Sequence, residues 1–285
     1  MSVTTFAKVF SLVFSLTLAA CSSPTVHPER GPSQPPWQAR AFLLGEVHDN
    51  EQGHQARLQF ARSNGLTQGQ SVTLIFEQIN RDMIGGSAFP NNQCQDKTCL
   101  TQAIEKSGWS VQYYKPWVDL ALENNWQVLP GNVSKADIGA VMSSSVSASF
   151  NEQAVEFNLQ DAENLPEAYR QALVQAMVDG HCGLIDKQTA WKMGQIQVAR
   201  DLWLASQIQG ALATSQRVIV LAGNGHINKD IGIPFWLARI HQDDYKAVAF
   251  TEGSSREPSS AYDQVFSVPV ADRQDPCEAL KKRFK

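Results

Sequence analysis

The stretch AFLLGEVHDN, residues 41–50, decides the fold class. Its first four residues are all apolar, without the polar alternation of a half-exposed strand, and Gly45 follows them. A short apolar run that ends in a turn residue predicts a strand buried on both faces, as in a parallel sheet. Glu46 and His48 come directly after the run, although a turn needs neither a carboxylate nor an imidazole. The stretch therefore predicts a parallel sheet and a polar site at the end of one strand.

Similar strand patterns recur along the chain, separated by helical patterns. Alternation of short apolar strands with helices is typical of α/β proteins. We therefore predict an α/β fold, with a mainly parallel β-sheet flanked by helices. The strands are expected at residues 40–47, 72–78, 126–132, 217–226, 243–252 and 263–268, and the helices at 51–64, 101–109, 116–125 and 231–240.

A long segment with little strand character separates the third and fourth predicted strands. Helical patterns cover residues 165–181 and 186–213. In the second of them Met193, Ile196, Ala199 and Trp203 recur at helical spacing and form one apolar face. We interpret residues 134–214 as a helical insertion within one domain that spans residues 38–285.

Composition narrows the class of protein. The chain has 285 residues, 43% of them hydrophobic and 18% charged, with a net charge of −4. This is an ordinary globular composition, long enough for one large domain. Nucleic-acid binding usually requires a basic surface, so we expect no nucleic-acid partner.

The N-terminal segment resembles an export signal. An apolar run from Val9 to Ala20 follows Lys8 and ends at Cys21, so residues 1–20 are interpreted as a signal peptide. LAAC resembles a lipobox, which implies that Cys21 carries the palmitate-type lipid anchor of a lipoprotein; a plain signal peptide with an incidental cysteine is the alternative. Residues 21–37 then form a lipidated tether. By resemblance to bacterial lipoproteins, Ser22 favours the outer membrane.

Four further cysteines remain for the mature chain, and an even count in an exported protein favours disulfides. Cys94 and Cys99 are close enough in sequence to close a small loop, and a bond between Cys182 and Cys277 would tie down the C-terminal segment. A zinc site is the competing interpretation, but no second local pair of cysteines completes it.

Polar residues follow three of the predicted strands. GEVH (45–48) and GNGH (223–226) share a G-x-x-H pattern, and Glu77 follows an apolar run of its own. In parallel sheets the carboxyl ends of the strands form the ligand-binding edge. We therefore expect one crevice that contains Glu46, His48, Glu77 and His226. These residue types suit a divalent metal held by His48, Glu77 and His226, a metal-free acid–base pair, or a polar network.

A second group of candidate residues lies in the middle of the chain. Tyr113 and Tyr114 stand among tryptophans, and a tyrosine in such a pocket can bind haem iron, although aromatic clusters are more often plain core. His181 and Cys182 lie at the end of one predicted helix. Gln197, Arg200 and Asp201 lie on the next helix, within QVARD.

These motifs together resemble a known family. LLGEVHDN, YKP ahead of NNWQVLPGN, DGHCG, the Q-x-x-R-D pattern and VLAGNGHINKDIGIPFWL resemble the ChaN-like haem-binding lipoproteins of Gram-negative bacteria, over roughly residues 40–240. The resemblance implies a lipid-anchored outer-membrane protein that acts in haem and iron uptake. It implies haem as cofactor, cofacial haems shared by a homodimer, and a TonB-dependent haem receptor as partner. It favours a binding protein over an enzyme.

The resemblance also implies particular ligands. The family's iron-binding tyrosine falls on Tyr114, through the pattern Tyr114-Lys115-Pro116. A histidine supports the haem, for which His181 is the first choice and His226 the second. The cysteine-bearing segment 88–99 departs from the family pattern and precedes the proposed tyrosine.

A wider resemblance supports a different function. TraB/TIKI-type proteases and erythromycin-esterase-like hydrolases carry similar G-x-x-H motifs and a glutamate after a strand, and in them these residues are catalytic. Here the pattern falls on His48, Glu77 and His226, with Glu46 beside them. A metal-dependent peptidase or esterase is therefore the alternative function.

Overall fold

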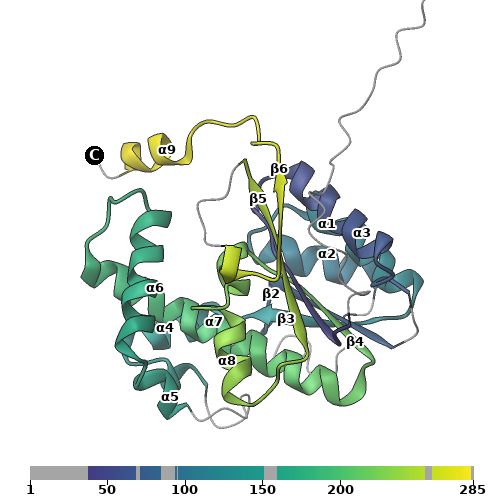
Figure 1. Cartoon of the computed structure of the whole chain (residues 1–285), viewed down its shortest axis with the longest axis horizontal. Helices are drawn as coiled ribbons and strands as arrows, with labels where there is room; N and C mark the ends of the chain where they lie inside the picture. The colour runs from purple at the N-terminus through teal and green to yellow at the C-terminus, as the bar shows by residue number, and fades with distance from the viewer. Residues whose placement is uncertain are drawn as a thin grey trace, which may run out of the picture.

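A six-stranded parallel sheet forms the centre of the computed structural model, which describes residues 38–68, 71–84, 94, 96–150, 159–253 and 259–283 (Figure 1). The strands follow one another across the sheet in the order β3-β2-β4-β1-β5-β6, and all pairs are parallel. Their bounds are β1 Ala41–Leu44, β2 Val72–Asn80, β3 Gln127–Asn132, β4 Arg217–Leu221, β5 Tyr245–Glu252 and β6 Gln264–Val268. The predicted α/β class with a parallel sheet is confirmed.

The unbroken apolar runs arise because both faces of the sheet are covered. Successive side chains of a strand point to opposite faces. Phe42 and Leu44 accordingly pack in one hydrophobic core, whereas Leu43 belongs to the core on the other side of the sheet. All three side chains are fully buried, so no position in this strand can be polar without cost.

Helices α1 (Glu51–Ser63), α2 (Lys97–Lys106) and α3 (Val111–Glu123) contribute to the core on the Phe42 side. The opening stretch also explains where α1 begins. Asn50 is the N-cap, and its side chain accepts a hydrogen bond of 2.7 Å from the backbone nitrogen of Gly53. The polar run after β1 therefore serves two purposes, since its last residue starts a helix and the residues before it reach the crevice.

The other face is covered by the helices between β3 and β4, together with α8 (Ile233–Arg239). The long helix α7 packs against the sheet itself, and Trp203 Nε1 donates a hydrogen bond of 2.9 Å to the carbonyl of Pro130 in β3. The helix α6 packs on α7. Within the predicted insertion 134–214, α7 is thus a layer of the α/β core, and the division into subdomains remains a prediction. The bounds are α4 Lys135–Ser143, η1 Ser147–Ser149, α5 Gln160–Glu163, α6 Glu167–Gly180 and α7 Lys187–Thr214.

Two disulfides are present and have the predicted pairing. Cys94 is bonded to Cys99, and Cys182 is bonded to Cys277 across a sequence separation of 95 residues. The second bond joins the end of α6 to the C-terminal helix α9 (Pro276–Arg283), which lies beside α6 and away from the sheet (Figure 1). A zinc site made of these cysteines is therefore excluded by their oxidation. Two short helices complete the described chain, η2 Asn224–Ile227 and η3 Ser259–Ala261.

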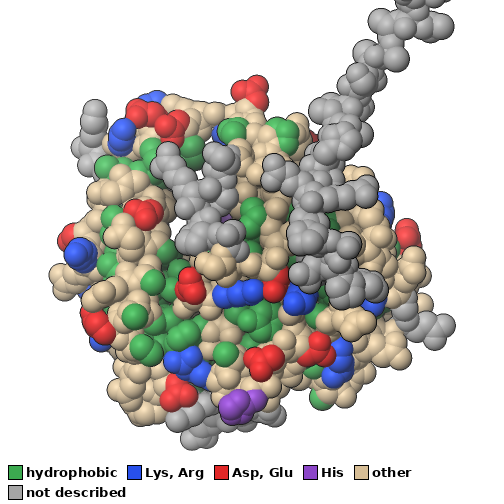
Figure 2. Space-filling model, in the orientation of Figure 1, with side chains coloured by type: hydrophobic (Ala, Val, Ile, Leu, Met, Phe, Trp, Pro, Cys, Tyr) green, Lys and Arg blue, Asp and Glu red, His purple; other side chains and the backbone are tan. Residues whose placement is uncertain are grey.

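The surface is mixed in character. On the face drawn in Figure 2, acidic and basic side chains are interspersed, and hydrophobic side chains gather between them over the helices. None of the described helices is long and apolar enough to cross a bilayer. The signal peptide 1–20, Cys21, the tether and most of the segment 88–99 lie outside the described residues.

Candidate functional site

The four predicted crevice residues come from three neighbouring strands. Glu46 and His48 follow β1, and His226 lies in the short helix η2 that follows β4, rather than in the strand itself. Glu77 lies inside β2, just past Phe76, which pairs with the last residue of β4. Because β1, β4 and β2 are adjacent and parallel, their carboxyl ends bring all four side chains to one edge.

Glu46 is the centre of one half of this crevice. Its Oε1 accepts hydrogen bonds from the Tyr114 hydroxyl (2.6 Å) and from Gln78 Nε2 (3.1 Å), and it lies 2.8 Å from His48 Nδ1. Its Oε2 pairs with the buried guanidinium of Arg57. Burial alone would raise the pKa of Glu46, but the charge of Arg57 and the bond to His48 outweigh it and lower the pKa to about 2. Glu46 is therefore a buried carboxylate that stays ionised.

His48 is the part of the crevice that meets solvent. Its side chain is 41% exposed, and its ring lies 4.5 Å from the ring of Trp109. Burial lowers the pKa of His48, but the bond to Glu46 and the charge of Glu77 prevail and raise it. Since Nδ1 donates to Glu46, the ring nitrogen that can exchange a proton with a ligand is Nε2.

His226 is the centre of the other half. Its Nδ1 lies 2.6 Å from Asp201 Oδ1 and its Nε2 lies 3.4 Å from Glu77 Oε1, while the backbone nitrogen of Gly223 donates to Glu77 Oε2 at 2.7 Å. Burial would lower the pKa of His226, but the two carboxylates raise it to about 10. Burial raises the pKa of Asp201 to about 6, whereas the charge of His226 holds that of Glu77 below its usual range. Both imidazole nitrogens therefore face carboxylates.

This arrangement suits acid–base chemistry better than metal binding. Both ring nitrogens of His226 already face carboxylates of the protein, Asp201 on one side and Glu77 on the other. Among the described residues, no group of three or more His, Cys, Asp or Glu side chains could hold a metal ion. The geometry thus gives the metal alternative at His48, Glu77 and His226 no support.

The sequence prediction missed three residues of the crevice network and placed a fourth outside it. His54 Nε2 donates to the carbonyl of His48 at 2.9 Å, and its Nδ1 lies 3.0 Å from the Arg57 guanidinium. Burial and the charge of Arg57 lower the pKa of His54 to about 4, so this ring is neutral. Each missed residue is polar yet occupies a buried position among apolar neighbours, and that mismatch is the signal that would have found them. They are His54, Arg57 and Gln78, whereas Asp201 was identified with the second group of candidate residues and lies instead beside His226 in the crevice.

The predicted haem ligands are not brought together. Tyr114 is completely buried and its hydroxyl donates to Glu46, and burial together with Glu46 raises the pKa of the phenol. In this arrangement its oxygen is not presented to an external ligand. The neighbouring Tyr113 is half-buried, stacks on His54 at 4.6 Å, and lines a groove of about 270 Å³ between α1 and α3.

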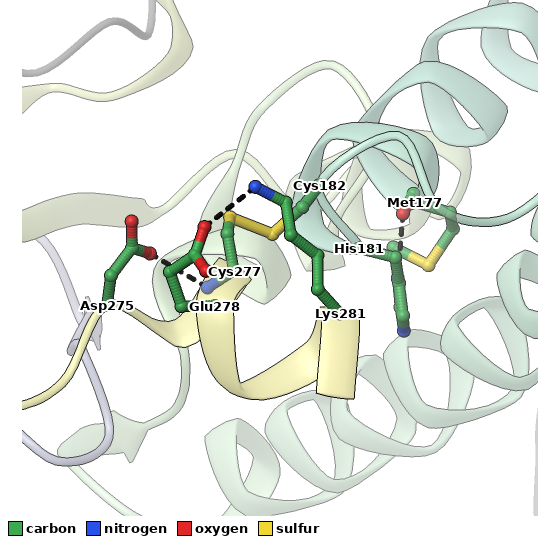
Figure 3. Close-up of a disulfide and its surroundings, with 7 residues drawn as sticks. All are labelled: Met177, His181, Cys182, Asp275, Cys277, Glu278 and Lys281. Carbon is green, nitrogen blue, oxygen red and sulfur yellow. Dashed lines mark hydrogen bonds and ion pairs between the residues drawn. A yellow bond between two sulfur atoms is a disulfide. The ribbon is translucent and has the colours of Figure 1, made fainter. Parts of the chain in front are cut away.

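His181 lies elsewhere, at the C-terminal end of α6. Its ring is half-buried and its Nδ1 lies 2.7 Å from the carbonyl oxygen of Met177, one helical turn earlier (Figure 3). Among the described residues, the side-chain contact of His181 is to Met177 rather than to a residue of the crevice, whereas His226 lies in the crevice.

Comparison with known proteins finds similar solved structures. No curated protein matches the chain. The structure of ChaN of Campylobacter jejuni with cofacially bound haem is similar with a TM-score of 0.59 and 19% identity, over 80% of this chain and 87% of that one. The erythromycin esterase mutant EreC H289N has a TM-score of 0.39 and 14% identity, over 75% and 70% of the two chains. The type III effector HopBA1 has a TM-score of 0.38 and 13% identity, over 81% and 88%.

A family model settles the assignment that the motifs predicted. The model for haem-binding uptake proteins of the Tiki superfamily, ChaN, matches residues 37–237. The match covers most of the chain and includes the strands that build the crevice, the helices α6 and α7, and His181. The chain therefore belongs to the ChaN family of haem-binding uptake proteins.

Proposed function

We propose that this protein binds haem and that His181 supplies the iron ligand. The family assignment supports haem as the cofactor. The observation that carries the ligand choice is the hydrogen bond between His181 Nδ1 and the Met177 carbonyl. A carbonyl oxygen only accepts, so Nδ1 carries a proton, and in the neutral ring Nε2 is the nitrogen with the lone pair. An imidazole fixed in this tautomer by a second bond is the usual form of a metal-ligating histidine.

The surroundings of His181 suit a porphyrin. Val174, Met177 and Val178 are half-buried and precede His181 at spacings of seven, four and three residues, which places them on the same face of α6. An apolar helix face with one histidine offers contact for the macrocycle and a ligand for the iron. Figure 3 shows the imidazole directed away from the disulfide, with Met177 beside it.

The resemblance assigned the iron to Tyr114, with support from His181 as the first choice and from His226 as the second. For Tyr114 and His226 these roles require the residue to leave its buried partners, which are Glu46 for Tyr114 and the two carboxylates for His226. Tyr113 is the accessible tyrosine of the pair. His181, Tyr114 and Tyr113 are therefore separate arms of one test.

The test is a titration of the mature domain with haemin, in which binding is monitored by absorbance in the Soret band. We expect His181→Asn to weaken binding by at least tenfold and to shift the band, because loss of even a residue that orients a metal ligand costs roughly 10–100-fold. His241→Asn, at an exposed histidine, is the matched control. Loss of the band in Tyr114→Phe or Tyr113→Phe, with His181→Asn unaffected, would move the iron to that tyrosine.

We also propose that the protein is anchored at the outer membrane through a lipid on Cys21 and acts in haem-iron uptake. The lipobox, Ser22 and the family assignment support this role. Labelling with an alkyne palmitate analogue should mark the wild-type chain and not Cys21→Ser, and membrane fractionation should place only the labelled chain in the outer membrane. Cells that lack the protein should grow poorly on haemin as sole iron source. Cross-linking in cells that produce the protein tests a TonB-dependent receptor as partner.

A second candidate function is hydrolysis at the crevice without a metal. The observation that favours it is the half-exposed imidazole of His48 bonded to the ionised Glu46. With Nδ1 held by Glu46, Nε2 can accept a proton from a water molecule that attacks an ester or amide carbonyl. Because His48 must be neutral for this step and its pKa is raised, the rate should rise with pH through that pKa.

Activity on ester and peptide panels tests this candidate. Hydrolysis that survives chelators and disappears in His48→Gln supports the metal-free site. Hydrolysis that chelators abolish and divalent ions restore supports the metal-dependent alternative instead. No turnover by the wild-type chain removes both.

A further inference from the structure

The groove between α1 and α3 has an aromatic floor and a polar rim. Its volume is about 270 Å³. On the floor, His54 and Trp117 are buried, and Leu58 and Tyr113 are half-buried. Ligand pockets usually measure about 300–1,000 Å³, so a groove just below that range suits a small molecule. The rim consists of exposed side chains, which are Glu51, Gln55, Gln112 and Pro116.

The head of the groove lies next to the crevice, because α1 and α3 both begin there. Helix α1 begins three residues after His48, and α3 begins two residues after Trp109. The rings of His48 and Trp109 are 4.5 Å apart, so the two helices start side by side. The groove and the crevice also share a wall, since His54 donates from Nε2 to the carbonyl of His48 at 2.9 Å. A molecule in the groove would therefore have one end near the exposed imidazole of His48.

Tyr113 gives the groove an aromatic surface of fixed orientation. Its ring stacks on that of His54, with the centroids 4.6 Å apart and the planes parallel to within 1°. His54 thus covers one face of Tyr113 and, among the described residues, is the ring that stacks on it. The other face is available to a ligand, because Tyr113 is only half-buried. An aromatic ring stacked on that face would increase affinity about two- to tenfold beyond the burial of its area.

The charge of the rim favours a neutral ligand. Glu51 is acidic, and none of the described lining residues is a lysine or an arginine. A carboxylate in the groove would therefore find no cation to pair with and would be repelled by Glu51. The groove fits an uncharged molecule with an aromatic ring.

We propose that the groove holds the aromatic acyl group of a small neutral ester or amide, whose carbonyl then lies at His48. The inference rests on the proposed hydrolysis at the crevice and names its substrate class. His48 Nε2 takes a proton from water, and the water oxygen bonds to the acyl carbon. The bond from that carbon to the alcohol or amine then breaks, and the leaving group departs with the proton from Nε2. The products are an aromatic carboxylic acid and an alcohol or amine.

The first experiment compares 4-nitrophenyl phenylacetate with 4-nitrophenyl acetate as substrates of the mature chain. We expect KM to be about two- to tenfold lower for the phenylacetyl ester, because only its ring reaches Tyr113. Gln55→Trp fills the groove from its exposed rim and should abolish this difference, while KM for the acetyl ester stays unchanged. Gln171→Trp on α6 is the matched control and should behave like the wild type. Each of these glutamines is exposed and donates to a glutamate one turn earlier, at 3.1 Å for Gln55 and 2.9 Å for Gln171.

Two substitutions of Tyr113 test the stacking directly. Tyr113→Phe keeps the ring and should keep the preference for the phenylacetyl ester. Tyr113→Ala removes the ring and should raise KM for this ester to the level of the acetyl ester, without lowering kcat. Equal kinetics of the two variants would overturn the stacking role.

A second readout does not depend on hydrolysis. Phenylacetone has the same aromatic group and a carbonyl, but it contains no bond that water can cleave. Its binding is measured by the NMR shifts of the Tyr113 and His54 ring protons, which a stacked ring displaces. We expect these shifts in the wild type and in His48→Gln, and much weaker binding in Gln55→Trp.

The outcomes separate this inference from the proposed hydrolysis. If phenylacetone shifts both rings but no ester is cleaved, the hydrolysis fails and the groove stands as a binding site for the aromatic group. If both esters are cleaved with equal KM and the ketone shifts neither ring, the hydrolysis stands and the groove assignment is overturned. If one equivalent of haemin displaces the ketone, the groove is a haem site and the acyl assignment is overturned.

Discussion

At the scale of single residues, the crevice consists of two carboxylate–imidazole groups, one of which reaches solvent while the other is buried. Glu46 and His48 form the group that meets solvent, and Asp201, His226 and Glu77 form the enclosed one. In the enclosed group both ring nitrogens of His226 face carboxylates of the protein. In the other group only Nδ1 of His48 is bonded to Glu46, so Nε2 can exchange a proton with solvent or a ligand. Residue-scale predictions therefore concern titration and hydrogen bonding.

The stability of the protein should depend on pH through His226. Its pKa is raised to about 10 in the folded protein, above the ordinary value of 6.5, so protonation favours the folded state. This contribution is complete below pH 6.5 and is lost as the pH rises towards 10. Urea unfolding at pH 6.5, 8 and 9.5 measures it, with His226→Gln as comparison. The variant should lose about 3–5 kcal/mol at pH 6.5, since two buried carboxylates lose their cation, and the gap between the two proteins should narrow with pH. A gap that stays constant or widens would contradict this assignment.

Tyr114→Phe should affect stability and leave the haem spectrum unchanged. The substitution removes the hydroxyl that donates to the ionised Glu46, and a hydrogen bond to a charged group contributes about 1.5–3 kcal/mol. Tyr113→Phe is the matched control, because no hydrogen bond of the Tyr113 hydroxyl contributes to this network, and it should change the unfolding free energy by less than about 0.5 kcal/mol. Equal effects of the two substitutions would argue against the buried role of Tyr114.

At the scale of elements, close backbone approach fixes how α7 and the strands meet. A Cβ on Gly131 in β3 would lie 2.7 Å from Leu204 Cδ2 of α7 and 2.7 Å from the backbone oxygen of Phe76 in β2. Strand β3 cannot move away from β2, because the two strands are paired by backbone hydrogen bonds. A Cβ on Gly210, within α7, meets nothing within 4 Å. The two glycines therefore differ in the space that a side chain would find: none at Gly131 in the sheet, and open space at Gly210 in the helix.

The two glycines should respond to alanine with opposite sign. Gly131→Ala should destabilise the protein by about 1–3 kcal/mol or more through overpacking, and should displace Glu77. Gly210→Ala should stabilise it by about 0.5–1 kcal/mol, because alanine is the better helix former. Thermal and urea unfolding measure both. Destabilisation by Gly210→Ala would show that α7 has a close neighbour at that position.

At the scale of the whole molecule, haem binding is proposed to assemble two copies of the chain. The support is the family assignment and the half-buried apolar face of α6 beside His181. A haem on such a face leaves one side of its ring exposed, and a second copy can cover it.

Sedimentation of the mature domain with and without haemin measures this assembly. The haem-free chain is expected to be a monomer, and one equivalent of haemin should shift it to a dimer. His181→Asn should remain a monomer under the same conditions, with His241→Asn dimerising like the wild type. If the haem-free chain is already a dimer, and haemin does not change its dissociation constant, then dimerisation does not depend on haem.

Much of this structure follows from the sequence alone. The apolar run of residues 41–44 determined a strand buried on both faces, and comparable runs placed β2, β3, β4, β5 and β6 to within a few residues. This works because burial on both faces leaves a local signature in every strand. Glu46, His48, Glu77 and His226 were also identified, since carboxyl ends of parallel strands converge.

What only the tertiary structure decided is which partner each group has. Arg57 and His54 reach the crevice from α1, which directly follows it in the chain, Asp201 reaches it from the distant helix α7, and Tyr114 is turned inward onto Glu46. Partner choice depends on packing between elements, for which no local pattern exists, and that packing separates the acid–base crevice from His181.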